Sequence, residues 1–346
     1  MQHDMSLREF LKAIPKVSLH LHLEGSVQAQ TVVELAEKHG VALPAHKVPQ
    51  DIYSYPDIIK FLEVYSLVAH VVRDVDDFRR ITYETLREAS EHNVRYREMF
   101  WSPMAHMDVG VKYPDALEGI VRGIRDAKKD FGIDCRLIAD IDRMREPELG
   151  LELVETVLNH RCDDLIGLGL DYAEAGNPPE KFWKAFRLAG SRGLRLTAHS
   201  CEDAPPRNVE TCLDLLGCER IDHGYHVIED ERITARCVEE GIVFNATPVS
   251  TAWVYFGNDL PHHPIRKMVA AGIKVTLDCD DPPMFKTDPT RDYIVAVEEM
   301  GFSIEQIREC VMNSIDGSWL DDPSKRRMRR DLSLEFDRLA AQLPER

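Results

Sequence analysis

Short apolar runs rich in β-branched residues alternate with longer amphipathic stretches along the whole chain. The runs have the composition of strands, and the spacing of apolar residues in the stretches predicts helices. Several stretches end at a glycine, as at Gly40 and Gly241, which is a common way for a helix to stop. A regular succession of β-then-α units predicts an α/β fold with a parallel sheet. The expected strands span residues 17–23, 94–101, 135–141, 165–172, 194–200, 220–224, 242–248 and 274–280.

Two arrangements of a parallel sheet fit this succession, a closed (β/α)8 TIM barrel and an open doubly wound sheet. Polar residues gather at the C-terminal ends of the first, fifth, sixth and eighth expected strands. Only a closed barrel places the first and last strands side by side, so this distribution favours the barrel. Gly167-Leu168-Gly169 begins like a dinucleotide-binding fingerprint but lacks its third glycine. We expect one barrel domain over residues 1–346.

Two regions exceed the simple β-then-α repeat. Residues 43–73 form a long, aromatic-rich connection after the first expected strand. This helical insertion either covers a site at the strand ends or packs its aromatic side chains on the outside of the barrel. The tail after Phe302 is expected to be helical, and its basic run over residues 325–330 is typical of a solvated helix face.

Composition excludes several classes of protein. The formal net charge of -17 over 346 residues argues against a nucleic-acid binder, which needs a basic surface. No run of apolar residues is long enough to span a membrane. The start of the chain lacks the basic and apolar blocks of a signal peptide, and the eight cysteines are scattered without a Cys-x-x-Cys pair. We therefore expect a cytoplasmic protein with reduced thiols.

His20 and His22 lie two residues apart in the first expected strand, with apolar residues on either side. Alternate residues of a strand project to the same face. Two imidazoles on one face make half of a binding site for a borderline-soft divalent metal. A pair of hydrogen-bonded core histidines is the alternative interpretation, and histidines at other strand ends weigh against it.

His199 ends the fifth expected strand, and Asp280 ends the eighth. Together with His20 and His22 they form a candidate ligand set of three imidazoles and one carboxylate. This set suits Zn²⁺ and leaves a position for water. A zinc ion there would lower the pKa of bound water and supply hydroxide near neutral pH.

Three further polar residues lie beside these candidate ligands. His223, at the end of the sixth expected strand, is a candidate base that holds and deprotonates water. Glu202 is a candidate acid that protonates the substrate, and Asp281 is free to form a hydrogen bond with it. For His223 and Glu202, the alternative is a structural role, such as orienting a ligand or capping a helix.

Other zinc signatures are incomplete in this chain. His22-Leu23-Glu24 fits the His-x-Glu half of the cytidine-deaminase signature, but no Pro-Cys-x-x-Cys follows it. The metalloprotease pattern His-Glu-x-x-His is also absent from the sequence.

In combination, four motifs resemble the adenosine deaminase branch of the amidohydrolase superfamily, in the same order and over nearly the whole chain. They are His20-Leu21-His22-Leu23-Glu24-Gly25, His199-Ser200-Cys201-Glu202, Asp222-His223-Gly224 and Asp280-Asp281-Pro282. The resemblance implies a zinc-dependent barrel hydrolase that acts on the 6-amino group of a purine. It implies one zinc ion per chain on the four candidate ligands, Glu202 as the acid that protonates the ring nitrogen, His223 as the water-activating residue and Asp281 as a contact to the purine.

The departures from the family pattern concern the part of the substrate beyond the purine ring. Glu24 stands where adenosine deaminases usually carry an Asp for the ribose. Asp171-Tyr172-Ala173-Glu174 differs from their Asp-Leu-Ala-Gly and is more similar to the adenine deaminase branch. The segment 246–251 lacks their Asn. We expect Glu24, Gly169 and Glu174 to contact the substrate and the loop 246–256, with its aromatic residues, to wall the pocket or pack its rim.

The leading hypothesis is hydrolytic deamination of an adenosine- or adenine-type 6-aminopurine, which gives the 6-oxopurine and ammonia. A deaminase for an N6-substituted or otherwise modified purine is the first alternative. A non-catalytic metal-binding protein is the second, and loss of Glu202, His223 or Asp281 would have indicated it; all three are present. The expected partner is a small purine, and the sequence does not indicate an oligomeric state.

Overall fold

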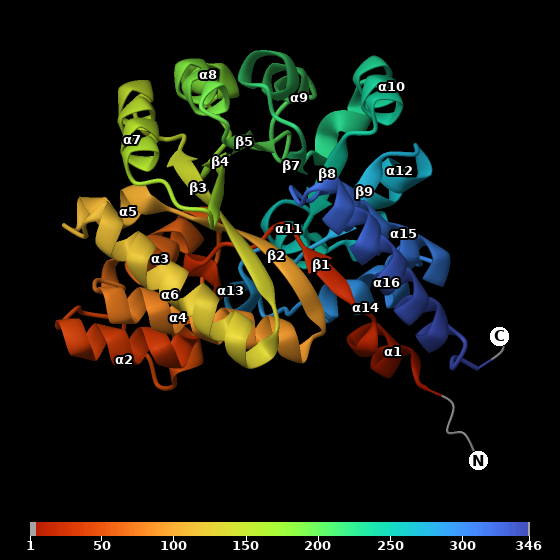
Figure 1. Cartoon of the computed structure of the whole chain (residues 1–346), viewed down its shortest axis with the longest axis horizontal. Helices are drawn as coiled ribbons and strands as arrows, with labels where there is room; N and C mark the ends of the chain where they lie inside the picture. Colours follow the sequence, from red (N-terminus) through yellow and green to blue (C-terminus); the bar gives the residue numbers. More distant parts are fainter. Residues whose placement is uncertain (1–4, 345–346) are drawn as a thin grey trace.

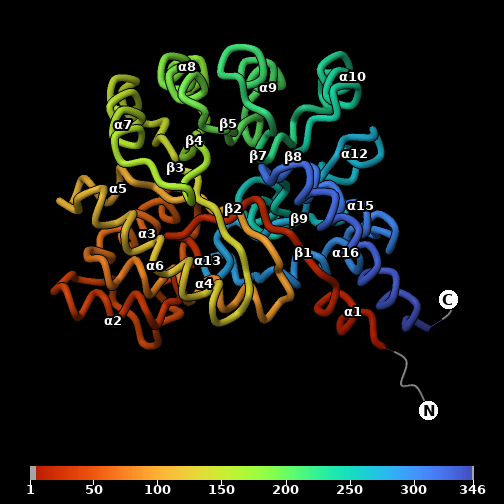
Figure 2. Tube along the Cα trace, in the orientation of Figure 1, coloured from red at the N-terminus to blue at the C-terminus, as the bar shows by residue number. Residues whose placement is uncertain are grey.

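The computed structural model of the chain describes residues 5–344. Within them, each pairing between neighbouring strands is parallel. The strands lie at the centre of the molecule, and helices surround them (Figures 1 and 2). The strands are β1 (Lys16–Ser18), β2 (Val94–Trp101), β3 (Asp134–Asp142), β4 (Leu165–Asp171), β5 (Arg195–Leu196), β6 (His199–Ser200), β7 (Ile221–His223), β8 (Val243–Ala246) and β9 (Lys274–Leu277).

Two hydrogen-bonded sheets join to form a closed barrel. Their strand orders are β1-β2-β3-β4-β5 and β6-β7-β8-β9. Between β5 and β6, the Thr197 N–H donates to a β4 carbonyl at 3.1 Å, so the two are halves of one interrupted strand. At the other seam Leu21 pairs with Asp280 in a parallel bridge, and the His22 N–H donates to the Asp280 carbonyl at 3.1 Å. The prediction of a TIM barrel is therefore confirmed, and the open sheet is excluded.

The first strand is shorter than its apolar pattern predicts. β1 ends at Ser18, whereas the pattern predicts a strand over residues 17–23. The carboxylate of Asp278 accepts the backbone N–H groups of Leu19 at 2.7 Å and His20 at 3.1 Å. Because a buried side chain takes these two N–H groups, the regular ladder between strands stops there.

Helices form the outer ring, as the amphipathic stretches between the strands predict. α10 ends at Gly241, whose φ of 67° is left-handed and favours glycine. The helices of the ring are α2 (Ala29–His39), α4 (Val75–Glu91), α6 (Tyr113–Phe131), α7 (Pro147–Asn159), α8 (Trp183–Ser191), α9 (Arg207–Glu210, continued by a π-helical turn over Thr211–Leu216), α10 (Glu231–Glu240), α12 (Ile265–Ala270), α14 (Arg291–Glu298) and α15 (Ile304–Gly317).

Four further helices lie near the C-terminal ends of the strands. They are α3 (Ile58–Val71) of the insertion, α5 (Pro103–Asp108), α11 (Pro248–Val254) and α13 (Pro282–Phe285). Towards the termini, α1 (Leu7–Ala13) and α16 (Asp322–Ala340) lie near each other (Figure 2). Phe10 of α1 packs edge-on against Phe336 of α16, with 5.4 Å between the ring centroids.

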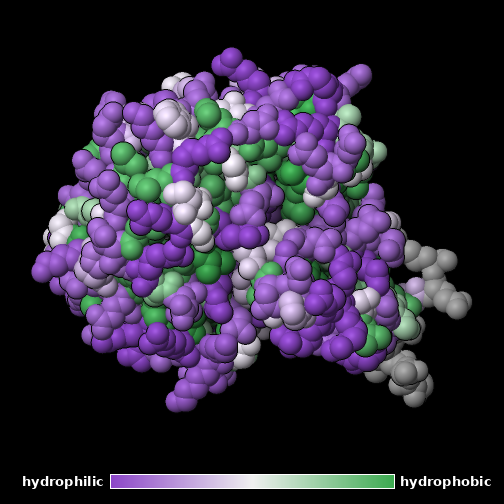
Figure 3. Space-filling view, turned by 45° about the horizontal axis from the view of Figure 1, so that its top comes forward, coloured by the Kyte–Doolittle hydropathy of each residue, from purple (hydrophilic) through white to green (hydrophobic). Residues whose placement is uncertain are grey.

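Apolar side chains fill the interior, and hydrophilic residues cover most of the surface shown in Figure 3. Buried apolar side chains form one continuous core. On the face shown in Figure 3, hydrophilic residues dominate the surface, and hydrophobic residues show mainly between them. Most side chains of the basic run 325–330 are exposed, as expected of a solvated face. No helix among the described residues is long and apolar enough to cross a membrane.

A buried ion pair joins Glu98 of β2 to Arg220, directly before β7, and both contact the end of α15 or the segment after it. Arg220 Nη1 donates to the Glu98 carboxylate and to the Gly317 carbonyl. The other Glu98 oxygen accepts the Trp319 N–H at 2.6 Å, and the Arg220 guanidinium lies 3.9 Å from the centroid of a Trp319 ring. Both charged side chains are at most 1% exposed, so each is the buried counter-charge of the other.

We predict that Arg220→Met destabilises the protein by about 3–5 kcal/mol, because it leaves the Glu98 carboxylate buried without a counter-charge. The double variant Glu98→Leu/Arg220→Met should lose less, since no lone charge remains. Denaturant unfolding of the three proteins measures both values. A double variant less stable than Arg220→Met would contradict this account of the pair.

Candidate active site at the carboxyl ends of the strands

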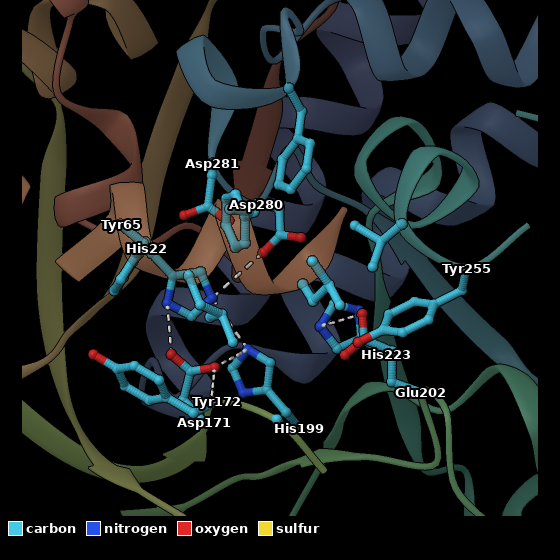
Figure 4. A pocket seen from close by; sticks show the side chains of 16 residues that line it. His22, Tyr65, Asp171, Tyr172, His199, Glu202, His223, Tyr255, Asp280 and Asp281 are labelled. Atoms are coloured by element: carbon cyan, nitrogen blue, oxygen red, sulfur yellow. Dashed lines mark hydrogen bonds and ion pairs between the residues drawn. The ribbon is translucent and has the colours of Figure 1, made fainter. Parts of the chain in front are cut away.

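A cavity opens where the barrel strands end, between the insertion helix α3 on one side and the segment after α11 on the other (Figure 4). Its wall combines imidazoles and carboxylates with apolar and aromatic side chains. The lining residues are His22, Ile58, Phe61, Leu62, Tyr65, Asp171, Tyr172, Ala173, His199, Glu202, His223, Val254, Tyr255, Asp280, Asp281 and Phe285.

Four predicted metal ligands meet at the base of this cavity. His20 Nε2 lies 3.0 Å from Asp280 Oδ1, and His22 Nε2 lies 3.4 Å from the same oxygen. His22 Nε2 also lies 3.1 Å from His199 Nε2. His20, His22 and Asp280 form one of the groupings able to hold a metal ion. The structure therefore brings together the residues that the strand ends predicted.

Hydrogen bonds hold the outward-facing nitrogens of His20 and His199, and a carboxylate lies near that of His22. His20 Nδ1 lies 3.0 Å from Asp222 Oδ1, and His199 Nδ1 donates to a β4 carbonyl at 3.0 Å. His22 Nδ1 lies 3.5 Å from Asp171 Oδ2. Partners of this kind set the tautomer of a ligating imidazole and direct its other nitrogen to the metal.

The charges around the rings favour a cation at this point. Burial alone would lower the pKa of His20, but Asp222 and Asp280 outweigh it and raise that pKa to about 10. Three imidazoles and a carboxylate are also the donor types that zinc takes. The residues present therefore fit a divalent metal of zinc's kind.

Several site residues have an unusual backbone conformation. Asp280 has φ 60° and His223 has φ 69°, and Tyr172 and Cys201, which follow strands, have φ 70° and 60°. Left-handed conformations are uncommon for residues other than glycine and cluster at functional sites. Here they turn the chain sharply at the strand ends.

Glu202 and His223 lie next to each other in the cavity wall (Figure 4). Glu202 Oε1 lies 3.6 Å from His223 Nε2. Burial, reinforced by Asp280, raises the pKa of Glu202 well above its ordinary value. Burial also lowers the pKa of His223 well below its ordinary value. These directions favour a protonated carboxyl at Glu202 and a neutral imidazole at His223.

Asp281 has one oxygen available to a ligand. Its Oδ1 is buried and has no hydrogen-bond partner among the described residues. A Cβ added to Gly25 would lie 1.5 Å from this oxygen, so only glycine leaves room for the carboxylate. Burial, together with Asp280, raises the pKa of Asp281 well above its ordinary value, which favours the protonated carboxyl.

Three residues expected to contact the substrate do not line the cavity. Glu174 accepts the N–H groups of Cys201 at 2.9 Å and Glu202 at 3.0 Å, so it holds the loop that carries Glu202. Gly169 makes room for Asp140, whose Oδ1 would lie 2.0 Å from an added Cβ.

Glu24, the third of these residues, is fully buried. Its carboxylate accepts hydrogen bonds from the Ser102 N–H at 3.0 Å and the Tyr65 hydroxyl at 3.2 Å, and it lies 2.9 Å from His106 Nε2. Tyr65 lines the cavity and Glu24 does not. The structure thus places Glu24 behind the cavity wall.

Part of the insertion lies in the cavity wall, and its role as a cover of the site stays a prediction. Four residues of α3 line the cavity, and Phe61 also stacks on Phe285 of the barrel at 4.8 Å. In the loop 246–256, Tyr255 lines the cavity, while Trp253 packs on Tyr55 at 5.3 Å.

Sequence reasoning missed Asp171, Asp222 and Ser250 as parts of the site. Ser250 donates to Asp280 Oδ2 at 2.7 Å, and the two aspartates approach the ligand rings. The position of Asp222 directly before His223 at a strand end was the available signal. Ser250 lies in the short helix α11, within a segment for which the sequence predicts a loop, so no spacing rule predicts its direction.

Comparison with known proteins agrees with this geometry. The family model described as Adenosine deaminase matches residues 15–334. An adenine deaminase of Rhodospirillum rubrum is 34% identical, over 94% of this chain and 97% of its own. A zinc-bound amidohydrolase of Burkholderia ambifaria superposes with a TM-score of 0.91 at 39% identity, covering 96% of this chain and 93% of its own. An adenine deaminase of Arthrobacter aurescens gives 0.89 at 31%, covering 93% and 99%. The chain belongs to the adenosine deaminase family.

Proposed function

We propose that this protein is a zinc-dependent hydrolase that deaminates a 6-aminopurine, with the free base adenine as its substrate. The carrying observation is that one cavity brings together imidazoles and a carboxylate able to hold a metal ion, a Glu202 carboxyl whose pKa is raised by burial, and an Asp281 oxygen without a hydrogen-bond partner among the described residues. In the net reaction water adds to C6, the bond from C6 to the amino nitrogen breaks, and ammonia leaves. Adenine and water thus give hypoxanthine and ammonia.

We propose His20, His22, His199 and Asp280 as the ligands of one zinc ion per chain. Their convergence and donor chemistry support this assignment, and the Burkholderia ambifaria amidohydrolase binds zinc. When bound, zinc lowers the pKa of water so that hydroxide is available near neutral pH.

The remaining polar residues would move protons and hold the purine. Glu202 would donate its carboxyl proton to a ring nitrogen, which makes the adjacent C6 more electrophilic. His223, neutral because of its lowered pKa, would accept a proton from the attacking water at Nε2. Asp281 would hold the five-membered ring through a hydrogen bond to a ring nitrogen. General acid–base roles of this kind typically contribute about 10²–10⁴ in rate.

The cavity wall supports a free base rather than a nucleotide. Among the described residues, no lysine or arginine side chain lines it, so a phosphate group would find no counter-charge there. The part formed by α3 is mostly apolar, with Ile58, Phe61 and Leu62. Relatives that are 31–35% identical over about nine-tenths of this chain bear the name adenine deaminase.

Other features support one catalytic domain in the cytoplasm. The buried apolar side chains form a single core, and all eight cysteines are free thiols. We propose that the whole chain acts as one unit on a small purine.

Ammonia release from adenine, adenosine, deoxyadenosine and N6-alkyl adenines tests the proposed function. We expect adenine to give the highest kcat/KM. A higher value for an N6-alkyl adenine would favour the alternative of a deaminase for modified purines. No ammonia from any of them, with zinc-loaded protein, would exclude both.

Purified protein should contain one zinc ion per chain by elemental analysis. His20→Ala and His22→Ala should lose zinc and activity together, because each removes a ligand. His39 offers a matched control, since it forms a separate grouping with Asp74 and Asp77. Zinc lost from His39→Ala but retained in His20→Ala would contradict the ligand assignment.

Glu202→Gln should retain zinc and lower kcat by about 10²–10⁴, because the amide keeps the size of the side chain but has no proton to transfer. Single-turnover kinetics and elemental analysis of the same preparation measure both effects. A variant with a near-native rate would remove Glu202 from the mechanism.

A further inference from the structure

A closed polar network lies directly behind the cavity wall. Glu24 Oε1 lies 3.0 Å from the Ser102 nitrogen and 2.9 Å from His106 Nε2. Its Oε2 accepts the Tyr65 hydroxyl at 3.2 Å, and that hydroxyl also lies 3.1 Å from Ser102 Oγ. All four side chains are nearly inaccessible. Each oxygen of the buried carboxylate therefore already has a partner in the protein.

Tyr65 is the member of this network that also lines the cavity. Tyr65 belongs to α3, while Glu24 lies two residues after His22 in the chain. The Tyr65 ring lies 6.3 Å from the His22 ring and 5.9 Å from the Tyr172 ring, edge-on to both. Figure 4 shows Tyr65, His22 and Tyr172 on one side of the cavity. The Tyr65 ring thus stands between the ligand space and Glu24.

This arrangement opposes a sugar on the purine in two ways. The Tyr65 ring occupies the space through which a substrate group would reach Glu24. A sugar hydroxyl could bond to Glu24 only by displacing the Tyr65 hydroxyl, which exchanges one hydrogen bond for another without gain. A substrate without a sugar leaves the network intact.

We propose that Tyr65 is a specificity-determining residue that restricts the site to free purine bases by sealing Glu24 from the cavity. The inference rests on the proposed function and deepens it. It also explains why the Glu24 carboxylate does not bind the sugar of a nucleoside. Removing the Tyr65 ring exposes a carboxylate suited to accept a hydrogen bond from a sugar hydroxyl.

The test compares kcat/KM for adenosine and adenine in zinc-loaded wild type, Tyr65→Ala and Tyr65→Phe. Tyr65→Ala should raise the adenosine-to-adenine ratio at least about tenfold, since a polar group placed to bond a substrate hydroxyl discriminates strongly. Tyr65→Phe retains the ring and should keep the preference for adenine. Tyr65→Leu, which retains more apolar volume, replaces the alanine variant if that variant does not fold by thermal unfolding.

Two further variants distinguish the effect of exposing Glu24 from the effect of enlarging the cavity. Phe61→Ala enlarges the same wall without uncovering Glu24 and should shift the ratio far less. Tyr65→Ala/Glu24→Gln should lose most of the gain made by Tyr65→Ala. An unchanged ratio in Tyr65→Ala, or a gain that survives Glu24→Gln, would overturn the inference while adenine turnover upholds the function. A wild type inactive on adenine would overturn both.

Discussion

The seam between the first and last strands is the constraint on which the site depends. Leu21 pairs with Asp280, and the Asp278 carboxylate caps the N–H groups at the end of β1. This seam brings His20 within 3.0 Å of Asp280, although 260 residues separate them in the sequence. Without closure, half of the metal-binding donors would lie on the opposite edge of an open sheet.

The site concentrates features that are unfavourable for folding. His223 and Asp280 have left-handed backbone conformations, and buried carboxylates surround the imidazoles. A metal ion would offset much of this cost, because it supplies the positive charge that these groups favour. Residues outside the cavity also hold these groups in place. Asp222 contacts His20, and Ser250 donates a hydrogen bond to Asp280.

The sequence predicts the barrel and the convergence of His20, His22, His199 and Asp280, because strand periodicity and the common direction of parallel strands determine both. It does not predict the positions of Glu24 and Glu174. Each carboxylate is held by groups distant in the chain: Glu24 by Tyr65, 41 residues away, and Glu174 by the Glu202 N–H, 28 residues away. Whether a carboxylate faces a ligand or a neighbouring loop depends on tertiary packing, which no local pattern records.

The most direct test of the central claim is a crystal structure of the zinc-loaded protein with hypoxanthine, using anomalous scattering at the zinc edge. The account predicts one anomalous peak, from a zinc ion bound by the Nε2 atoms of three histidines and by Asp280. The purine should lie between Glu202 and Asp281. A peak held instead by His22, Asp171 and His199, an alternative grouping of donors, would contradict it.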